Sequence, residues 1–178
     1  MRADSNSPIH RYFAGLAENT FQSQLGVVDP SLIDYLSDLL VRFVRSDVVH
    51  RIRSISGRPL MSIAEMSAEA KNRLGDARRE LHCHIGDFAL FWAGVYPEAL
   101  RRRASESEGQ FEDYCSHGKR SYHIASTIEA ADEAAPPAVV LHRLSDDFEL
   151  CAYGLREVRR EWEDGDDGTF GPGAILLN

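Results

Sequence analysis

Residues 76–96 read DARRELHCHIGDFALFWAGVY and are followed directly by Pro97, and this stretch decides the fold class. Large apolar residues recur along it at intervals of four, three and four, namely at Leu81, Ile85, Phe88 and Trp92. This spacing places them on one face of an α-helix. Proline lacks an amide hydrogen and clashes with the preceding turn, so it ends such a helix. The stretch therefore predicts a long helix with one buried face.

The same spacing continues on both sides of this helix. Asp29 followed by Pro30 is typical of a helix start, because aspartate caps the first turn and proline fits its first position. Ser62 and Glu65 have the spacing of a capping box and predict a short helix. Apolar stripes predict further helices over residues 9–20, 32–43, 107–134 and 140–162, the third opened by a capping box at Ser107 and Gln110. Because no segment shows the alternation of a strand, the sequence predicts an all-α protein, a compact helical bundle of about five to seven helices.

The length and composition favour one globular domain. The chain has 178 residues, of which 43% are hydrophobic and 27% charged, so it can bury a core without disulfides or metal. We expect a single helical domain over residues 1–163. Residues 164–178 are rich in glycine and acids and contain no lysine or arginine, and this segment is predicted to be disordered, or to form a strap if Ile175, Leu176 and Leu177 dock on a surface. Residues 46–61 are less regular and are predicted to be a loop with one or two further helical turns.

Charge and hydropathy limit the partners that we expect. The formal net charge is -8, which does not attract phosphate backbones, so nucleic acid is not an expected partner. The longest uncharged apolar stretch, residues 88–96, is too short to cross a membrane. The first eight residues lack the basic and apolar layout of a signal peptide. A cytoplasmic location is therefore expected.

Each of the three cysteines stands three residues before a glycine. The pairs are Cys83 and Gly86, Cys115 and Gly118, and Cys151 and Gly154. Positions three apart share a helix face, so each pair makes a strip of small side chains on a predicted helix. Such strips allow close packing of helices, and they could also line a shared ligand pocket. The odd number of cysteines, all among apolar residues, indicates reduced and buried thiols.

A second group of polar residues borders the apolar face of the 76–96 helix. Glu80, His84 and Asp87 stand at positions i, i+4 and i+7, so they share one side of that helix. Two carboxylates and an imidazole suit a divalent transition metal such as iron or zinc. One helix cannot surround a metal, so a histidine from another helix, His117 or His142, would have to complete the site. The alternative is a helix flank on which these side chains meet water or pack sideways.

Two functional hypotheses follow from these patterns. The first is a small, soluble helical binding or interaction module for a small molecule or a protein partner, which could include a second copy of the chain in a homodimer. The second is a metal-dependent helical-bundle enzyme, with non-haem iron or zinc held by the ligands named above. The Glu-x-x-His signature of di-iron carboxylate proteins does not occur in the sequence, which weighs against that class of enzyme.

Overall fold

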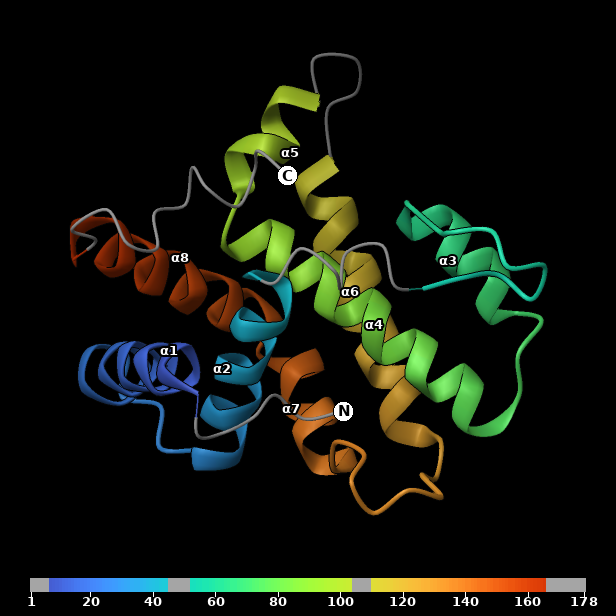
Figure 1. The fold of residues 1–178 in the computed structure, drawn as a ribbon, viewed down its shortest axis with the longest axis horizontal. Coiled ribbons are helices and arrows are strands. Elements are labelled where there is room, and N and C mark those ends of the chain that lie inside the picture. Colours follow the sequence, from blue (N-terminus) through green and yellow to red (C-terminus); the bar gives the residue numbers. More distant parts are fainter. Residues whose placement is uncertain (1–6, 45–51, 104–109, 166–178) are drawn as a thin grey trace.

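The computed structural model describes residues 7–44, 52–103 and 110–165, and these residues form an all-α fold (Figure 1). The described ranges contain eight α-helices and one π-helix, with no β-strand. The elements are α1 (Pro8–Glu18), η1 (Asn19–Gln24), α2 (Pro30–Val44), α3 (Ile63–Ala70), α4 (Gly75–Gly94), α5 (Pro97–Arg103), α6 (Gln110–Thr127), α7 (Ala138–Asp146) and α8 (Phe148–Gly165). The predicted all-α fold is confirmed, with slightly more helices than the sequence indicated.

The predicted helix starts are also confirmed by their capping contacts. The Asp29 carboxylate accepts a hydrogen bond from the amide of Leu32 at 3.1 Å, and α2 begins at Pro30. The Ser62 hydroxyl accepts from the amide of Glu65 at 3.2 Å at the start of α3. Each cap satisfies an amide that has no partner inside its helix, which is why these residues fix where the helices begin.

Three boundaries differ from the sequence prediction. The predicted helix over residues 140–162 is divided at Asp147, whose φ of -103° and ψ of 28° lie outside the helical range. The helix that begins at Gln110 ends at Thr127, seven residues earlier than predicted. Residues 52–60 form a tight loop and not a helical turn. Residues 45–51, 104–109 and 166–178 lie outside the described residues. The predicted disordered segment begins at Asp164, but Asp164 and Gly165 form the end of α8, so the prediction is wrong for these two residues.

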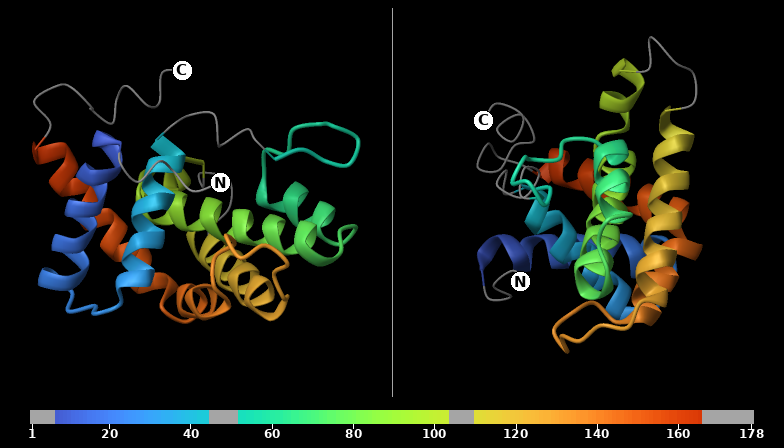
Figure 2. Two further views of the ribbon diagram at one scale, coloured as in Figure 1. Left: turned by 60° about the horizontal axis from the view of Figure 1, so that its bottom comes forward. Right: turned by 90° about the vertical axis from the view of Figure 1, so that its right-hand side faces the viewer.

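Helix α4 runs through the middle of the molecule. Thirteen of its twenty residues are buried, and it packs chiefly against α6, with α8, α3 and α2 as further neighbours. Figure 2 shows α1, α2 and the far end of α8 at one end of the molecule, whereas α3 and its preceding loop lie at the other. The second half of α4, residues 85–94, contains only one charged side chain, so it has to be covered on several sides, whereas the sequence predicted one buried face.

Aromatic rings tie the surrounding helices to this core. Phe13 of α1 meets Trp162 of α8 edge to face at 5.1 Å between ring centroids, and Phe43 of α2 stacks on Phe91 of α4 at 4.7 Å. All four side chains are at most 3% exposed. Buried aromatic pairs in these geometries contribute beyond the area that they remove from water. They therefore fix the outer helices against α4.

Candidate functional site

The structure places the three predicted ligands of α4 in different surroundings. Glu80 is exposed to solvent. His84 is half-buried, and its ring stacks on Phe43 at 6.2 Å between centroids. Asp87 is 2% exposed. A shared helical face therefore does not bring the three side chains into one environment, because the neighbouring helices cover only part of that face.

Asp87 is the centre of a buried polar network that joins three helices. One carboxylate oxygen, Oδ1, accepts hydrogen bonds from the hydroxyls of Tyr35 at 2.6 Å and Tyr122 at 2.8 Å. The other, Oδ2, accepts from Nη1 of Arg42 at 2.9 Å, which forms an ion pair. Tyr35 and Arg42 come from α2, and Tyr122 comes from α6. A buried carboxylate is stable only when it is paired and hydrogen-bonded, and this one meets both conditions.

The electrostatic surroundings keep the two tyrosines of the network protonated and Arg42 charged. Burial raises the pKa of Tyr35 and of Tyr122, and the negative charge of Asp87 raises it further. Burial alone would lower the pKa of Arg42, but the charge of Asp87 outweighs this effect, so the pKa of Arg42 is raised. The tyrosines therefore remain hydrogen-bond donors and the guanidinium remains charged. This network holds α2 and α6 against α4.

The three predicted glycine strips are occupied by aromatic rings. A Cβ atom at Gly86 would lie 2.6 Å from the ring of Tyr122, at Gly118 it would lie 2.4 Å from Phe148, and at Gly154 it would lie 2.3 Å from Phe21. Real Cβ atoms do not approach other atoms this closely, so each glycine leaves the space that a ring fills. At Gly86 this packing also has a polar consequence, because it lets the Tyr122 hydroxyl reach Asp87.

We expect Gly118→Ala to lower the free energy of unfolding by roughly 1 to 3 kcal/mol, because the new methyl group overlaps Phe148 and meets Ala89 at 3.0 Å. The matched control is Gly15→Ala on α1, where nothing lies within 4 Å of the new Cβ. That change should raise stability by roughly 0.5 to 1 kcal/mol through helix propensity. Urea unfolding followed by circular dichroism measures both. Equal effects of the two substitutions would contradict close packing at Gly118.

The three cysteines are buried and free, as the sequence predicted. Burial raises the pKa of Cys83 and of Cys151 to about 12, and that of Cys115 to about 11. These thiols therefore stay protonated at neutral pH, and a protonated thiol is a poor nucleophile. In this state the cysteines act as small apolar side chains within the helix contacts.

The two histidines proposed to complete a metal site are exposed on the surface, whereas Asp87 is buried. His117 is exposed on α6. His142 on α7 is also exposed, and its Nδ1 lies 2.9 Å from a carboxylate oxygen of Asp146. Within residues 7–44, 52–103 and 110–165 there is no group of three or more His, Cys, Asp or Glu side chains placed to hold a metal ion.

A second candidate site is the loop that precedes α3, which the sequence marked only as irregular. The loop closes like a hairpin, with the Ser54 amide donating to the carbonyl of Arg58 at 2.8 Å and the Leu60 amide donating to that of Ile52 at 2.9 Å. Leu60 is buried and Ile52 packs against the core, so the base of the loop is anchored by apolar contacts. Gly57 at the turn has a φ of +84°, which favours glycine.

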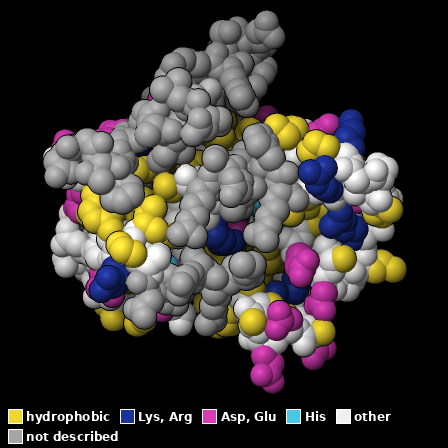
Figure 3. All heavy atoms as spheres, in the orientation of Figure 1, with side chains coloured by type: hydrophobic (Ala, Val, Ile, Leu, Met, Phe, Trp, Pro, Cys, Tyr) yellow, Lys and Arg dark blue, Asp and Glu magenta, His cyan; other side chains and the backbone are white. Residues whose placement is uncertain are grey.

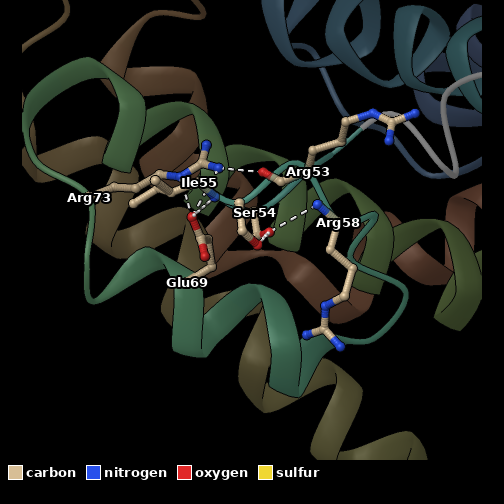
Figure 4. Close-up of polar contacts among 7 residues, drawn as sticks. Arg53, Ser54, Ile55, Arg58, Glu69 and Arg73 are labelled. Carbon is tan, nitrogen blue, oxygen red and sulfur yellow. Dashed lines mark hydrogen bonds and ion pairs between the residues drawn. The ribbon is translucent and has the colours of Figure 1, made fainter.

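Glu69 of α3 fixes the tip of this loop (Figure 4). Its Oε1 accepts from the backbone amide of Ile55 at 2.9 Å and from the guanidinium of Arg73 at 3.3 Å. The same guanidinium donates to the carbonyl of Arg53 at 2.5 Å. The Ser54 hydroxyl accepts from the Arg58 amide at 3.1 Å. The loop is therefore held in one conformation by side chains as well as by its own backbone.

This held loop and the residues beside it carry exposed apolar and basic side chains together. We define the Ile55 surface as Arg53, Ile55, Arg58, Met61 and Leu74. Of its apolar members, Ile55 is 74% exposed, Met61 53% and Leu74 82%. Arg53 and Arg58 are exposed, and in Figure 4 their side chains extend to different sides of the loop. Figure 3 shows Lys and Arg side chains next to hydrophobic ones over α3 and this loop.

The charge balance of the Ile55 surface differs from that of the whole chain. The only carboxylate paired with one of its arginines is Glu65, 3.5 Å from Arg58, among the ion pairs of the described residues. That arginine side chain is 68% exposed, so the pair is weak. A chain with a net charge of -8 thus presents a locally basic surface with apolar side chains in it. Neither the charge nor the exposure could be read from sequence spacing.

Comparison with protein-family models, with curated proteins and with solved structures finds no match for this chain. None of the helices in the described part of the chain is both long enough and apolar enough to span a membrane. The function therefore has to be argued from the residues themselves.

Proposed function

We propose that the protein is an interaction module that recognises a peptide segment carrying acidic and apolar side chains, and that the Ile55 surface is its docking site. The observation that carries the proposal is the exposure of Ile55 on a loop that Glu69 and Arg73 hold in place. Isolated exposed apolar residues are common, but Ile55, Met61 and Leu74 all lie around α3: Met61 precedes it, Leu74 follows it and the Ile55 amide donates a hydrogen bond to Glu69 within it. Exposed large apolar residues gathered around one element are typical of an interaction site.

The rigidity of the loop supports this function. Binding to a flexible loop loses free energy because the loop must be ordered, whereas a preorganised loop avoids that cost. Here the hydrogen bonds of Glu69 and Arg73 form within the chain itself, before any partner is present. An exposed isoleucine on such a loop can then enter an interface without a change in the backbone.

The positive charges of the Ile55 surface support an acidic partner. Arginine is enriched at interfaces, because its guanidinium forms paired hydrogen bonds with carboxylates and its stem packs on apolar groups. Arg53 and Arg58 stand on either side of Ile55 in the sequence, so an acidic and apolar segment matches both features. The metal-dependent alternative has no comparable support, because Glu80 is exposed and the Asp87 carboxylate is bonded to Arg42 and the two tyrosines.

A random peptide library selected on the immobilised full-length protein tests this function. We expect the enriched peptides to combine Asp or Glu with large apolar residues. Ile55→Ser and Arg58→Ser should each weaken their binding about tenfold or more, which corresponds to about 1.4 kcal/mol. The matched control is Val139→Ser, because Val139 on α7 is also 74% exposed. Peptides that bind all three variants equally well would contradict the proposal.

A further inference from the structure

The chain itself contains a segment with the chemistry that the Ile55 surface fits. Residues 164–177 read DGDDGTFGPGAILL, with three aspartates at one end and three consecutive large apolar residues, Ile175 to Leu177, at the other. We infer that the partner of the Ile55 surface is this segment of a second copy of the chain, so that two copies form a homodimer. The inference rests on the proposed function and names its ligand.

Charge complementarity is the first argument. Asp164 is exposed at the end of α8, and Asp166 and Asp167 follow it. No arginine or lysine follows Arg160 in the sequence, so every charged side chain in residues 164–177 is negative. The Ile55 surface offers Arg53 and Arg58 with a single weakly paired carboxylate. Opposite potentials of this kind steer association and fix the orientation of the partners.

Apolar complementarity is the second argument. Water-exposed Ile55, Met61 and Leu74 can each bury surface against a large aliphatic side chain, and residues 175–177 provide three of them. Burying an aliphatic side chain that was exposed removes apolar surface from water, which is favourable in proportion to the area buried. The acids alone would give a weak and salt-sensitive contact, so the apolar residues supply most of the affinity.

The positions of the Ile55 surface and of the end of α8 favour docking between two copies over docking within one chain. Helix α8 ends at one extremity of the molecule, and α3 with its loop lies at the opposite extremity in both Figure 1 and Figure 2. Ile175 follows Gly165 by ten residues, which span at most about 35 Å when fully extended. A globular domain of this length has a diameter of about 40 Å, and a path over its surface is longer. Docking within one chain would therefore require the segment to be almost fully extended, whereas docking on a second copy does not.

Reciprocal docking makes the dimer symmetric. Each chain places its segment 164–177 on the Ile55 surface of the other, so the same two sites are used twice around a two-fold axis. Once one segment has docked, the second docks within the same complex at a high effective concentration. Two moderate contacts then give one stable dimer. Both docking sites are occupied in it, so assembly stops at two copies and does not continue into a filament.

Sedimentation velocity of the full-length protein at micromolar concentration tests the dimer. We expect a dimer whose dissociation constant rises about tenfold or more on Ile55→Ser or Leu176→Ser, which corresponds to about 1.4 kcal/mol. Val139→Ser should leave the dissociation constant unchanged. Arg58→Asp should weaken the dimer, and the double variant Arg58→Asp with Asp166→Arg should restore it. A wild-type monomer, or a dimer that none of these substitutions weakens, would overturn the inference.

A labelled synthetic peptide of residues 163–178 separates this inference from the proposed function. We expect it to bind the full-length Leu176→Ser variant, and binding should be lost when Ile55→Ser is added. If library peptides bind through Ile55 but this peptide does not, the inference fails while the interaction module stands. If neither kind of peptide depends on Ile55, both fail. If the peptide binds through Ile55 but the wild-type chain remains monomeric in sedimentation, the exchange between copies is overturned.

Discussion

Replacing Asp87 with alanine is expected to lower the free energy of unfolding by about 3 to 5 kcal/mol, the largest effect of any single substitution considered for this protein. The reason is that the change removes one partner of a buried ion pair and leaves the other in place. Arg42 would keep its charge beside the core without the carboxylate that now lies 2.9 Å away. The hydroxyls of Tyr35 and Tyr122 would lose their acceptor as well.

The control for this experiment lies on the same helix. Glu80 is exposed, so Glu80→Ala should change the free energy of unfolding by no more than about 0.5 kcal/mol. Asp87→Asn distinguishes charge from hydrogen bonding, because asparagine can still accept from the tyrosines but cannot neutralise Arg42. Urea unfolding of the three variants gives the comparison. If Asp87→Ala were no more harmful than Glu80→Ala, the network would not be what holds α2 and α6 to α4.

Asp87 and Glu80 differ in burial, and the sequence did not predict this difference. The spacing correctly put both on one side of the predicted helix, but burial is decided by what covers that side. The partners of Asp87 come from positions 52, 45 and 35 residues away in the sequence, which no local pattern connects. Tyr122 lies within one of the predicted helices, yet no local pattern indicates that its hydroxyl meets a carboxylate.

The helices themselves were more predictable than their ends. Caps and prolines act locally, so the starts of α2 and α3 could be read directly. The break at Asp147 could not, because the apolar spacing runs on from Leu144 to Phe148 without interruption. Directly after the break, the Phe148 ring fills the space above Gly118 on α6. The spacing of apolar residues predicts which side chains face the core, but it does not predict whether the helix axis bends between them.

The Ile55 surface was missed for a related reason. Irregular composition predicted a loop, and residues 52–60 do form one, but a sequence does not show that Glu69 and Arg73 will hold it. An exposed isoleucine looks the same in the sequence as a buried one. Only the contacts of the folded chain distinguish the buried Ile63 from the exposed Ile55.

The stability of the protein is expected to fall between pH 6.5 and pH 4 because of His84. The pKa of His84 is lowered from 6.5 to about 4, chiefly by burial; the charge of Asp87 opposes this in part, and the charge of Arg42 adds to it. In the unfolded chain the same imidazole takes up its proton near pH 6.5. Between these values the unfolded state binds one proton more than the folded state, so stability rises with pH across this range and is complete above it.

The contribution of His84 reaches about 3 kcal/mol at pH 4, with a slope of about 1.4 kcal/mol per pH unit. His84→Phe tests it, because phenylalanine keeps an aromatic ring against Phe43 but cannot be protonated. We expect unfolding measured at several pH values to show a smaller loss in this variant than in the wild type below pH 6.5, with equal pH dependence above it. The His84 ring resonances in an NMR titration should remain those of the neutral form down to about pH 4. Protonation near pH 6.5 in the folded protein would show that His84 is open to water and that the packing between α2 and α4 is looser than described.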